Sequence, residues 1–336
     1  MSQLDTRTLG SRGPSITTVG FGAWAVGGDW LFGWGEQDDR DSIAAIHRAI
    51  DLGINWVDTA AVYGLGHSEE VVRRALVGMD EPPLVFTKCG LVWDTTDERP
   101  RPKENLQPAE IRRECEDSLR RLGIDQIDLY QFHWPDETGT PIEESWTVMA
   151  ELVAEGKVRF VGVSNFDAEL LSRCEAIMHV DSLQPPFNAI QRGLAAETLG
   201  WCRDHDTGVI VYSPMMSGLL TGRFSAERMA ALPETDWRHG FAEFQEPKRS
   251  RNLSLQEAMR PIAERHGVSV ASVAVAWTLA WEGVTGAIVG ARSAEQVDGW
   301  IAAGSFSLSP DELDELSASI AASGAGEGPT HPLRAG

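Results

Sequence analysis

The sequence predicts an α/β fold, a (β/α)8 TIM barrel with an N-terminal β-hairpin and long loops at one end. Three observations support this class. Eight strand-like apolar runs alternate with helix-like segments along the 336 residues, as in sheets whose parallel strands are joined by helices. No segment repeats at the period of a solenoid. Five of the runs end in polar or titratable residues, and barrels collect their chemistry at the carboxyl ends of their strands. These residues are Asp58, Lys88, His133, Ser164 and Gln184.

The chain starts with two short polar-apolar runs, 6–9 and 15–18, that flank a Gly/Pro turn. This pattern predicts a hairpin, which we expect to plug one end of the barrel. The strands are expected at 19–22, 54–58, 84–88, 127–133, 158–163, 182–184, 208–212 and 285–289. Apolar residues at helical spacing predict helices over 40–52, from Ser68, over 111–122, 142–153, 170–177 and 195–205, from Ser254, over 270–281 and from Ser309.

Several helix boundaries have local signals. Ser68, followed by two glutamates, is expected to cap the second helix, and Gly123 to end the third. Ser254 to Glu257 and Ser309 to Glu312 have the spacing of capping boxes. Pro261 is expected to kink or shorten the helix in which it lies.

Two long connections, 90–107 and 213–253, follow the third and seventh strands. Loops of this length commonly serve a function, often as lids. The small residues, Gly and Pro of 321–336 indicate a mobile tail. The whole chain, 1–336, is expected to form a single domain.

The composition indicates a globular cytoplasmic protein. A net charge of −21 argues against nucleic-acid binding, because such a surface repels polyanions. No apolar run is long enough for a membrane span, and the start lacks a leader pattern. The cysteines, Cys89, Cys115, Cys174 and Cys202, form no Cys-x-x-Cys pair, so we expect reduced thiols and no metal site.

Four residues suited to carbonyl reduction occur at or after three successive predicted strands: Asp58, Tyr63, Lys88 and His133. A free phenol, with a pKa of ~10, is a weak acid at neutral pH, so a proton-donating tyrosine needs a cation beside it. Lysine and tyrosine are scarce in this chain, which argues against chance placement. Each residue alone has an ordinary structural explanation, as a cap, a loop anchor, a strand end or a core histidine. Their joint occurrence at matching strand ends favours an active site.

Seven ordered motifs resemble the aldo-keto reductases, over 6–313. They are Asp58-Thr-Ala, Tyr63-Gly, Thr87-Lys88, His133-Trp-Pro-Asp136, Gly162-Val-Ser-Asn-Phe166, Tyr212-Ser-Pro214 and Val289-Gly-Ala-Arg292. The tryptophan-rich first loop and His-Trp-Pro-Asp are most similar to the bacterial branch of broad-range aldehyde and sugar reductases.

The resemblance implies an NAD(P)H-dependent oxidoreductase that converts an aldehyde or ketone to an alcohol. Tyr63 would give a proton to the carbonyl oxygen while the nicotinamide gives hydride to the carbon. Lys88 would lower the pKa of the phenol, Asp58 would hold Lys88, and His133 would orient the carbonyl as a neutral donor. The same residues would serve the reverse reaction on a sugar or secondary alcohol.

The resemblance also implies where the cofactor binds. Ser164, Asn165 and Gln184 would contact the carboxamide, and Tyr212 would stack on the nicotinamide. Arg292 favours NADPH over NADH, because a guanidinium fits a 2′-phosphate. The remaining contacts would come from Trp24, Asp58, Ser213, Pro214, Met215, Ser217, Gly218, Leu219, Gly290, Ala291, Ser293 and Gln296. Trp300 stands where the family commonly has an asparagine, so adenine is expected to stack there and NADH stays an alternative.

Aromatic residues in the predicted loops are expected to line the substrate pocket, namely Trp24, Trp30, Phe32, Trp93, Trp134 and Phe187. The small-molecule carbonyl or alcohol itself stays open, as does the oligomeric state. Two other classes also stay open. A barrel epimerase could use Asp58 and His133 without a nicotinamide, and a redox-sensing regulatory protein could bind the nicotinamide with little turnover.

Overall fold

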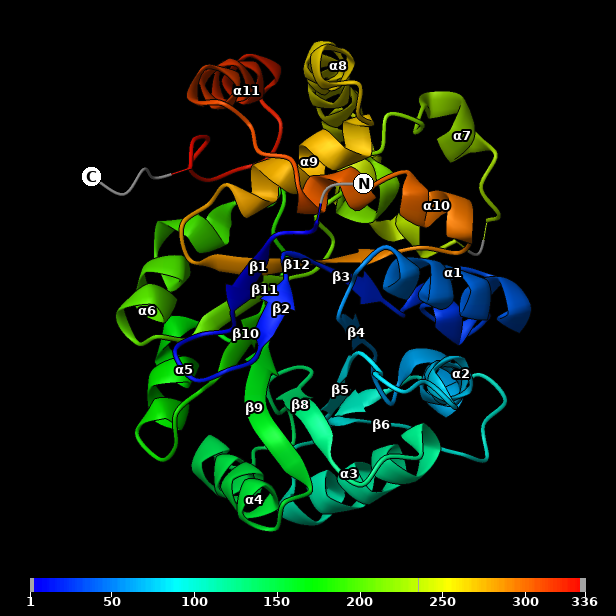
Figure 1. Cartoon of the computed structure of the whole chain (residues 1–336), viewed down its shortest axis with the longest axis vertical. Coiled ribbons are helices and arrows are strands. Elements are labelled where there is room, and N and C mark those ends of the chain that lie inside the picture. Colours follow the sequence, from blue (N-terminus) through cyan, green and yellow to red (C-terminus); the bar gives the residue numbers. More distant parts are fainter. Residues whose placement is uncertain (1–2, 235, 333–336) are drawn as a thin grey trace.

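The computed structural model describes residues 3–234 and 236–332. Eight parallel strands close into a barrel in the order β10-β11-β12-β3-β4-β5-β8-β9, with helices around it (Figure 1). The predicted fold class is confirmed. The barrel strands are β3 (Val19–Gly22), β4 (Trp56–Asp58), β5 (Leu84–Cys89), β8 (Ile127–Phe132), β9 (Val158–Ser164), β10 (Ser182–Gln184), β11 (Gly208–Val211) and β12 (Val284–Gly290).

The N-terminal hairpin closes the end of the barrel at which the strands begin. Its strands, β1 (Thr6–Thr8) and β2 (Ser15–Thr17), pair antiparallel. Leu9 and Ile16 are fully buried in one apolar cluster with Trp56, whose indole nitrogen donates to the Thr17 carbonyl at 2.8 Å. The predicted plug is therefore present.

The helices cover the outside of the barrel and bury one large apolar cluster against it. None of those described is long and apolar enough to cross a membrane. Their bounds are α1 (Asp39–Asp51), α2 (His67–Leu76), α3 (Pro108–Leu122), α4 (Ile142–Ala154), α5 (Ala168–Glu175), α6 (Thr198–Asp204), α7 (Ala226–Ala230), α8 (Lys248–His266), α9 (Val270–Leu279), α10 (Ala294–Asp298) and α11 (Pro310–Ser323).

Two predicted serine caps are wrong, although α2 does begin next to Ser68, at His67. Ser68 lies inside α2, where its hydroxyl donates to the Ala23 carbonyl at 2.9 Å instead of capping the helix. Ser254 lies in the middle of α8, which begins at Lys248 and continues through Pro261. In both cases the serine hydroxyl donates to a backbone carbonyl and does not accept from the backbone N–H groups at the helix start. Local spacing does not reveal this competition between the two kinds of partner.

Two other boundary predictions are confirmed. Gly123 ends α3 in the left-handed conformation, with φ of 67°, which glycine adopts without the penalty of a Cβ. Ser309 and Glu312 form a reciprocal capping box at the start of α11.

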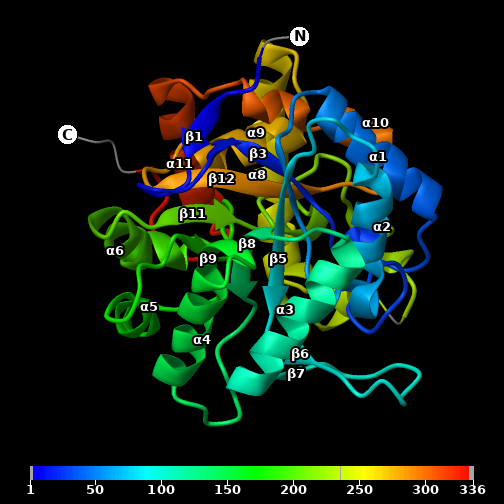
Figure 2. The same ribbon diagram turned by 60° about the horizontal axis from the view of Figure 1, so that its bottom comes forward.

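The loop after β5 contains a small hairpin, β6 (Leu91–Val92) with β7 (Lys103–Glu104). Figure 2 shows this loop projecting from the end of the molecule opposite the N-terminus. The tail that we expected to be mobile is described as far as residue 332. Ala325 is buried and its carbonyl accepts a hydrogen bond from Arg192 at 3.1 Å, while 333–336 lie outside the described residues.

Candidate active site

Asp58 and Lys88 form a buried ion pair at the carboxyl ends of β4 and β5. Lys88 Nζ donates to Asp58 Oδ1 at 2.6 Å and to the Thr59 carbonyl at 2.8 Å. The Lys88 side chain is 0% exposed and that of Asp58 is 3% exposed. Because water is excluded, each charge depends on the other for its stability.

Tyr63 lies beside this pair, on the short 3-10 turn that follows β4. Its Oη is 3.4 Å from Lys88 Nζ. The turn places Gly64 and Leu65 at φ of 60° and 56°. A Cβ at Gly64 would lie 2.1 Å from the Gly27 carbonyl, so the glycine lets the turn press against the first loop. The backbone of this turn thus directs the Tyr63 phenol toward the Lys88 ammonium.

His133 follows β8 and completes the group of four. Its ring centroid is 5.6 Å from that of Tyr63, and its backbone N–H donates to the Cys89 carbonyl at 2.9 Å. Burial, and secondarily the charge of Lys88, lowers the pKa of His133 well below the usual value. This direction favours the neutral imidazole that we expected.

The pKa of Tyr63 departs from the expectation. Burial raises the pKa of the phenol well above its usual value, and the Asp58 charge adds to this. Burial also lowers the pKa of Lys88, against the opposing charges of Asp58 and Glu69. The rise in the pKa of Tyr63 is opposite to the expected lowering, because taking the phenol out of water disfavours phenolate. The phenol keeps its proton, as a proton donor requires.

The second oxygen of Asp58 is bound by a glutamine. Gln184 Nε2 donates to Asp58 Oδ2 at 2.8 Å and to Gln131 Oε1 at 3.3 Å. Gln131, a polar residue inside an apolar strand, thus belongs to the site, although the prediction from the sequence did not include it. That position was a usable signal, because an inward polar side chain in a barrel strand needs a partner.

Ser164, Asn165 and Tyr212, predicted to lie together, do meet at the neighbouring strand ends. Ser164 Oγ donates to the Gln184 carbonyl at 2.7 Å. Asn165 Nδ2 donates to Ser164 Oγ at 3.0 Å and to the His133 carbonyl at 2.9 Å. The Tyr212 hydroxyl donates to Asn165 Oδ1 at 2.9 Å. Hydrogen bonds thus connect this group to the backbone of His133.

The segment after β11 bends sharply through several left-handed residues. Ser213, Met216, Ser217 and Gly218 have φ of 54°, 47°, 48° and 103°. Conformations of this kind in residues other than glycine are uncommon and gather at functional sites. This segment contains the predicted residues Ser213, Pro214, Met215, Ser217, Gly218 and Leu219, although the Leu219 side chain is fully buried.

Arg292 follows β12, after Gly290 and Ala291. Its Nε donates to Gln37 Oε1 at 2.7 Å, and its terminal nitrogen contacts the Glu36 carbonyl. Its backbone N–H donates to Gln296 Oε1 at 2.8 Å. The following helix has five residues and no side-chain cap from Ser293, so any phosphate contact here would depend mainly on the arginine.

Two aromatic predictions are wrong because the rings are buried. Trp300 is 2% exposed and belongs to the main apolar cluster, so its ring is not available to stack on adenine. Phe187 is fully buried, with its ring against Trp277 and Trp281 at 6.0 and 5.3 Å. It belongs to the core between the barrel and α9, and it is not a pocket wall.

The other aromatic residues gather nearer the mouth. Trp24 lies with its ring 6.5 Å from that of Tyr63 and 5.5 Å from that of Trp237. Trp34 contacts both tryptophans at 5.3 and 5.6 Å. Trp237 was not predicted, although it lies in the long connection 213–253. Trp30 is buried and Trp93 half-buried in the cluster with Tyr63, whereas Phe32 and Trp134 are exposed.

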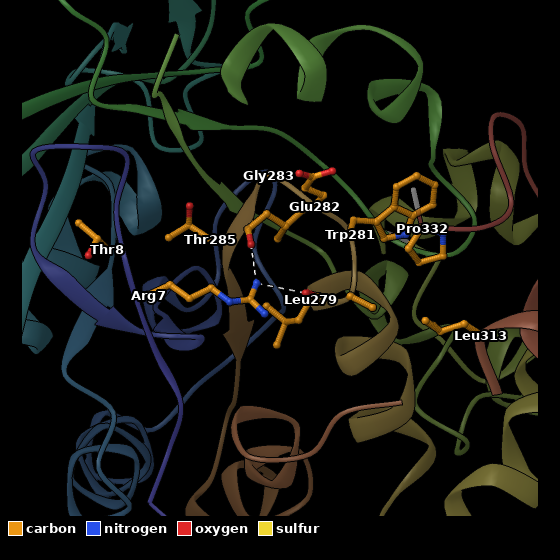
Figure 3. A pocket seen from close by; sticks show the side chains of 11 residues that line it. Arg7, Thr8, Leu279, Trp281, Glu282, Gly283, Thr285, Leu313 and Pro332 are labelled. Atoms are coloured by element: carbon orange, nitrogen blue, oxygen red, sulfur yellow. Dashed lines mark hydrogen bonds between the residues drawn. The ribbon is translucent and has the colours of Figure 1, made fainter. Parts of the chain in front are cut away.

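A separate pocket of about 500 Å³ lies at the opposite end of the barrel. There Arg7 donates to the carbonyls of Leu279 and Val284 (Figure 3). None of the predicted site residues lines it. The part of the chain that the structure describes has no group of three or more His, Cys, Asp or Glu side chains that could hold a metal ion.

Comparison with known proteins agrees with this geometry. A family model described as "Aldo/keto reductase family" matches residues 18–321. "Aldo-keto reductase YhdN" of Bacillus subtilis is 35% identical over 298 residues, which cover 88% of this chain and 87% of that protein. "NADH-specific methylglyoxal reductase" of Escherichia coli is 34% identical over 313 residues, covering 90% and 94%. The structure of the glycerol dehydrogenase AKR11B4 from Gluconobacter oxydans matches with a TM-score of 0.88 and 36% identity, covering 100% of both chains. The chain therefore belongs to the aldo/keto reductase family, the nicotinamide-dependent oxidoreductases of carbonyl groups.

Proposed function

We propose that this protein reduces an aldehyde or ketone to the alcohol with NADPH, and that Tyr63 is the proton donor. The observation that carries the proposal is the contact of the half-buried Tyr63 Oη with the buried Lys88 Nζ, 3.4 Å apart. The reaction would take place within one domain formed by the whole chain.

The strand-end residues fit the nicotinamide. A carboxamide needs both donors and acceptors. Ser164 and Asn165 carry both beside the ring of Tyr212, and in this structure they bond to one another, to Tyr212 and to the Gln184 and His133 carbonyls. When bound, the dinucleotide would supply the hydride. The residues of the chain then have separate tasks in the reaction.

Neutral His133 would orient the substrate oxygen, and Tyr63 would release its proton to that oxygen. The phenolate that remains would be stabilised by the Lys88 ammonium, an electrostatic effect that is strong where water is excluded. Asp58, bound to both Lys88 and Gln184, would keep the ammonium in place.

The test is a turnover assay with NADPH and with NADH against methylglyoxal, aromatic aldehydes and simple ketones, accompanied by a cofactor-binding measurement. Oxidation of NADPH that depends on a carbonyl supports the proposal. Absence of cofactor binding would favour a different barrel enzyme, and binding without turnover would favour a redox sensor. A second candidate function is alcohol oxidation, which the glycerol dehydrogenase relative favours. NADP+ with glycerol and secondary alcohols tests it.

Replacing Arg292 by alanine is expected to raise the KM for NADPH about tenfold to a hundredfold and to change that for NADH little. A charge-assisted hydrogen bond to a 2′-phosphate has this magnitude, and NADH lacks the phosphate. Steady-state kinetics with both cofactors measure the difference. An equal increase for both would mean that Arg292 acts only through its contacts with Gln37 and Glu36.

Replacing Trp237 by alanine is expected to raise the KM for aromatic aldehydes about three- to tenfold, with a smaller change in kcat. The reason is that Trp24, which adjoins Tyr63, loses a ring contact at 5.5 Å, and such contacts contribute about 0.5–1.5 kcal/mol. The matched control is Trp201→Ala, a half-buried tryptophan on the outer helix α6. Equal KM values for the two variants would contradict the expectation.

A further inference from the structure

A buried asparagine links the turn after β10 to the sharply bent segment after β11. Asn188 is 0% exposed. Its Oδ1 accepts from the backbone N–H groups of Ile190 and Gln191, both at 2.9 Å. Because Oδ1 is occupied by two donors, the amide nitrogen has to face the other way, and Nδ2 donates to the Ser213 carbonyl at 3.0 Å.

The carbonyl that accepts this bond belongs to the first of the left-handed residues after β11. Ser213 has φ of 54° and Met216 has φ of 47°. Asn188 Nδ2 also lies 3.5 Å from Met216 Sδ, and the Met216 N–H donates to the Ser213 carbonyl at 2.9 Å. One side chain thus contacts two residues in a conformation that is uncommon outside glycine. Such conformations persist only where the surrounding structure holds them.

The turn that carries Asn188 is itself held in place by other segments. The Tyr212 N–H donates to the Pro185 carbonyl at 3.0 Å, which joins the start of the turn to the end of β11. The C-terminal part of the chain packs against the same turn, since a Cβ at Gly326 would lie 1.8 Å from the Ile190 carbonyl. Asn188 therefore donates to its partner from a fixed position.

We propose that Asn188 is a positioning residue that holds the Ser213 backbone in the left-handed conformation and so preforms the segment 213–219 for the cofactor. The part that concerns the cofactor rests on the proposed function and on the expected contacts of this segment with the dinucleotide. The conformational part concerns the protein alone. A purely structural asparagine would stabilise the turn after β10 and leave the segment 213–219 unaffected.

The experiment compares Asn188→Ser with Asn252→Ser. Serine at 188 keeps an oxygen that can accept from the Ile190 N–H but is too short to reach the Ser213 carbonyl. Asn252 is also 0% exposed, and its Nδ2 donates to the Glu243 carbonyl at 3.0 Å. The control therefore makes the same chemical change at a buried bond to a different part of the long connection.

The first measurement is hydrogen exchange of the protein without cofactor. Amides of the segment 213–219 are expected to exchange about three- to tenfold faster in Asn188→Ser than in wild type, a factor that corresponds to one lost hydrogen bond. In Asn252→Ser, exchange in this segment is expected to match wild type. Equal rates in the two variants would overturn the inference, even if Asn188→Ser lowered the melting temperature.

The second measurement is the KM for NADPH in two backgrounds. In the wild-type background, Asn188→Ser is expected to raise it about three- to tenfold and to change kcat less than about twofold. In a Ser213→Gly background the same substitution should raise it less than about twofold. Serine without its anchor is expected to leave the left-handed region, whereas glycine populates that region about as readily as the right-handed one. An equal effect in both backgrounds, or none in either, would overturn the inference.

Two complications can be separated. If Asn188→Ser does not fold, Asn188→Thr keeps the same oxygen and fills more of the space that the amide leaves. The same faster exchange in the segment 213–219 is expected, and its absence overturns the inference. If the wild-type protein binds no NADPH, the proposed function fails, while hydrogen exchange still decides the role of Asn188.

Discussion

Replacing Tyr63 by phenylalanine is expected to lower kcat about a thousandfold or more while NADPH binding is kept. The substitution removes only the hydroxyl, and proton transfer by a positioned group contributes about 10²–10⁴-fold. Lys88 keeps its bonds to Asp58 and Thr59, so the site should stay assembled. Single-turnover kinetics and a cofactor titration by tryptophan fluorescence measure the two effects separately.

The matched control is Tyr130→Phe. Tyr130 is fully buried in β8, and its hydroxyl lies beside the Cys89 thiol and away from the group of four. The same chemical change there should leave kcat close to wild type. A Tyr63→Phe protein with wild-type rates would remove the phenol from its proposed role.

Replacing Lys88 by methionine is expected to abolish turnover and to lower the free energy of unfolding by about 3–5 kcal/mol near neutral pH. Removing one partner of a buried ion pair leaves an uncompensated charge, with a cost of this size. Burial already raises the pKa of Asp58, and loss of the ammonium would raise it further. The folded variant would take up a proton more readily than the unfolded chain, so its stability deficit should shrink as the pH falls. Urea unfolding at several pH values measures this.

The companion variant is Lys88→Met/Asp58→Asn. It removes both charges and retains an amide that can bond to Gln184, so it should recover part of the lost stability and none of the turnover. A single Lys88→Met variant as stable as wild type would show that Asp58 does not depend on the lysine. Equal stabilities of the single and double variants would show the same.

Much of the fold could be predicted because its signals are local. Each strand is a short apolar run, and Ser309 with Glu312 forms a cap within one turn of helix. Ser68 and Ser254 have similarly favourable spacing, yet each hydroxyl binds a carbonyl instead. Local spacing shows which caps are available, and packing determines which of them form.

The residues that could be predicted for the site lie at strand ends or in adjoining turns. A closed parallel barrel brings its strand ends together, so Asp58, Lys88 and His133 had to meet once the order of elements was known. Trp237 could not be chosen in this way, and Gln131 needed a different signal, its polar side chain inside an apolar strand. Trp237 lies on the long irregular connection 213–253. Gln131 is paired with Lys88 in the register of β8 on β5, so the two side chains lie on the same, inner face of the barrel.

The sequence by itself determined the eight-stranded barrel, the family and the group of four residues that includes Tyr63, because alternation and strand-end position are properties of neighbouring residues. The tertiary structure alone decided the directions of the pKa shifts, the burial of Trp300 and Phe187, and the pairing of Arg292 with Gln37 across 255 residues. These depend on which side chains exclude water from one another, and that is set by contacts between segments far apart in the chain.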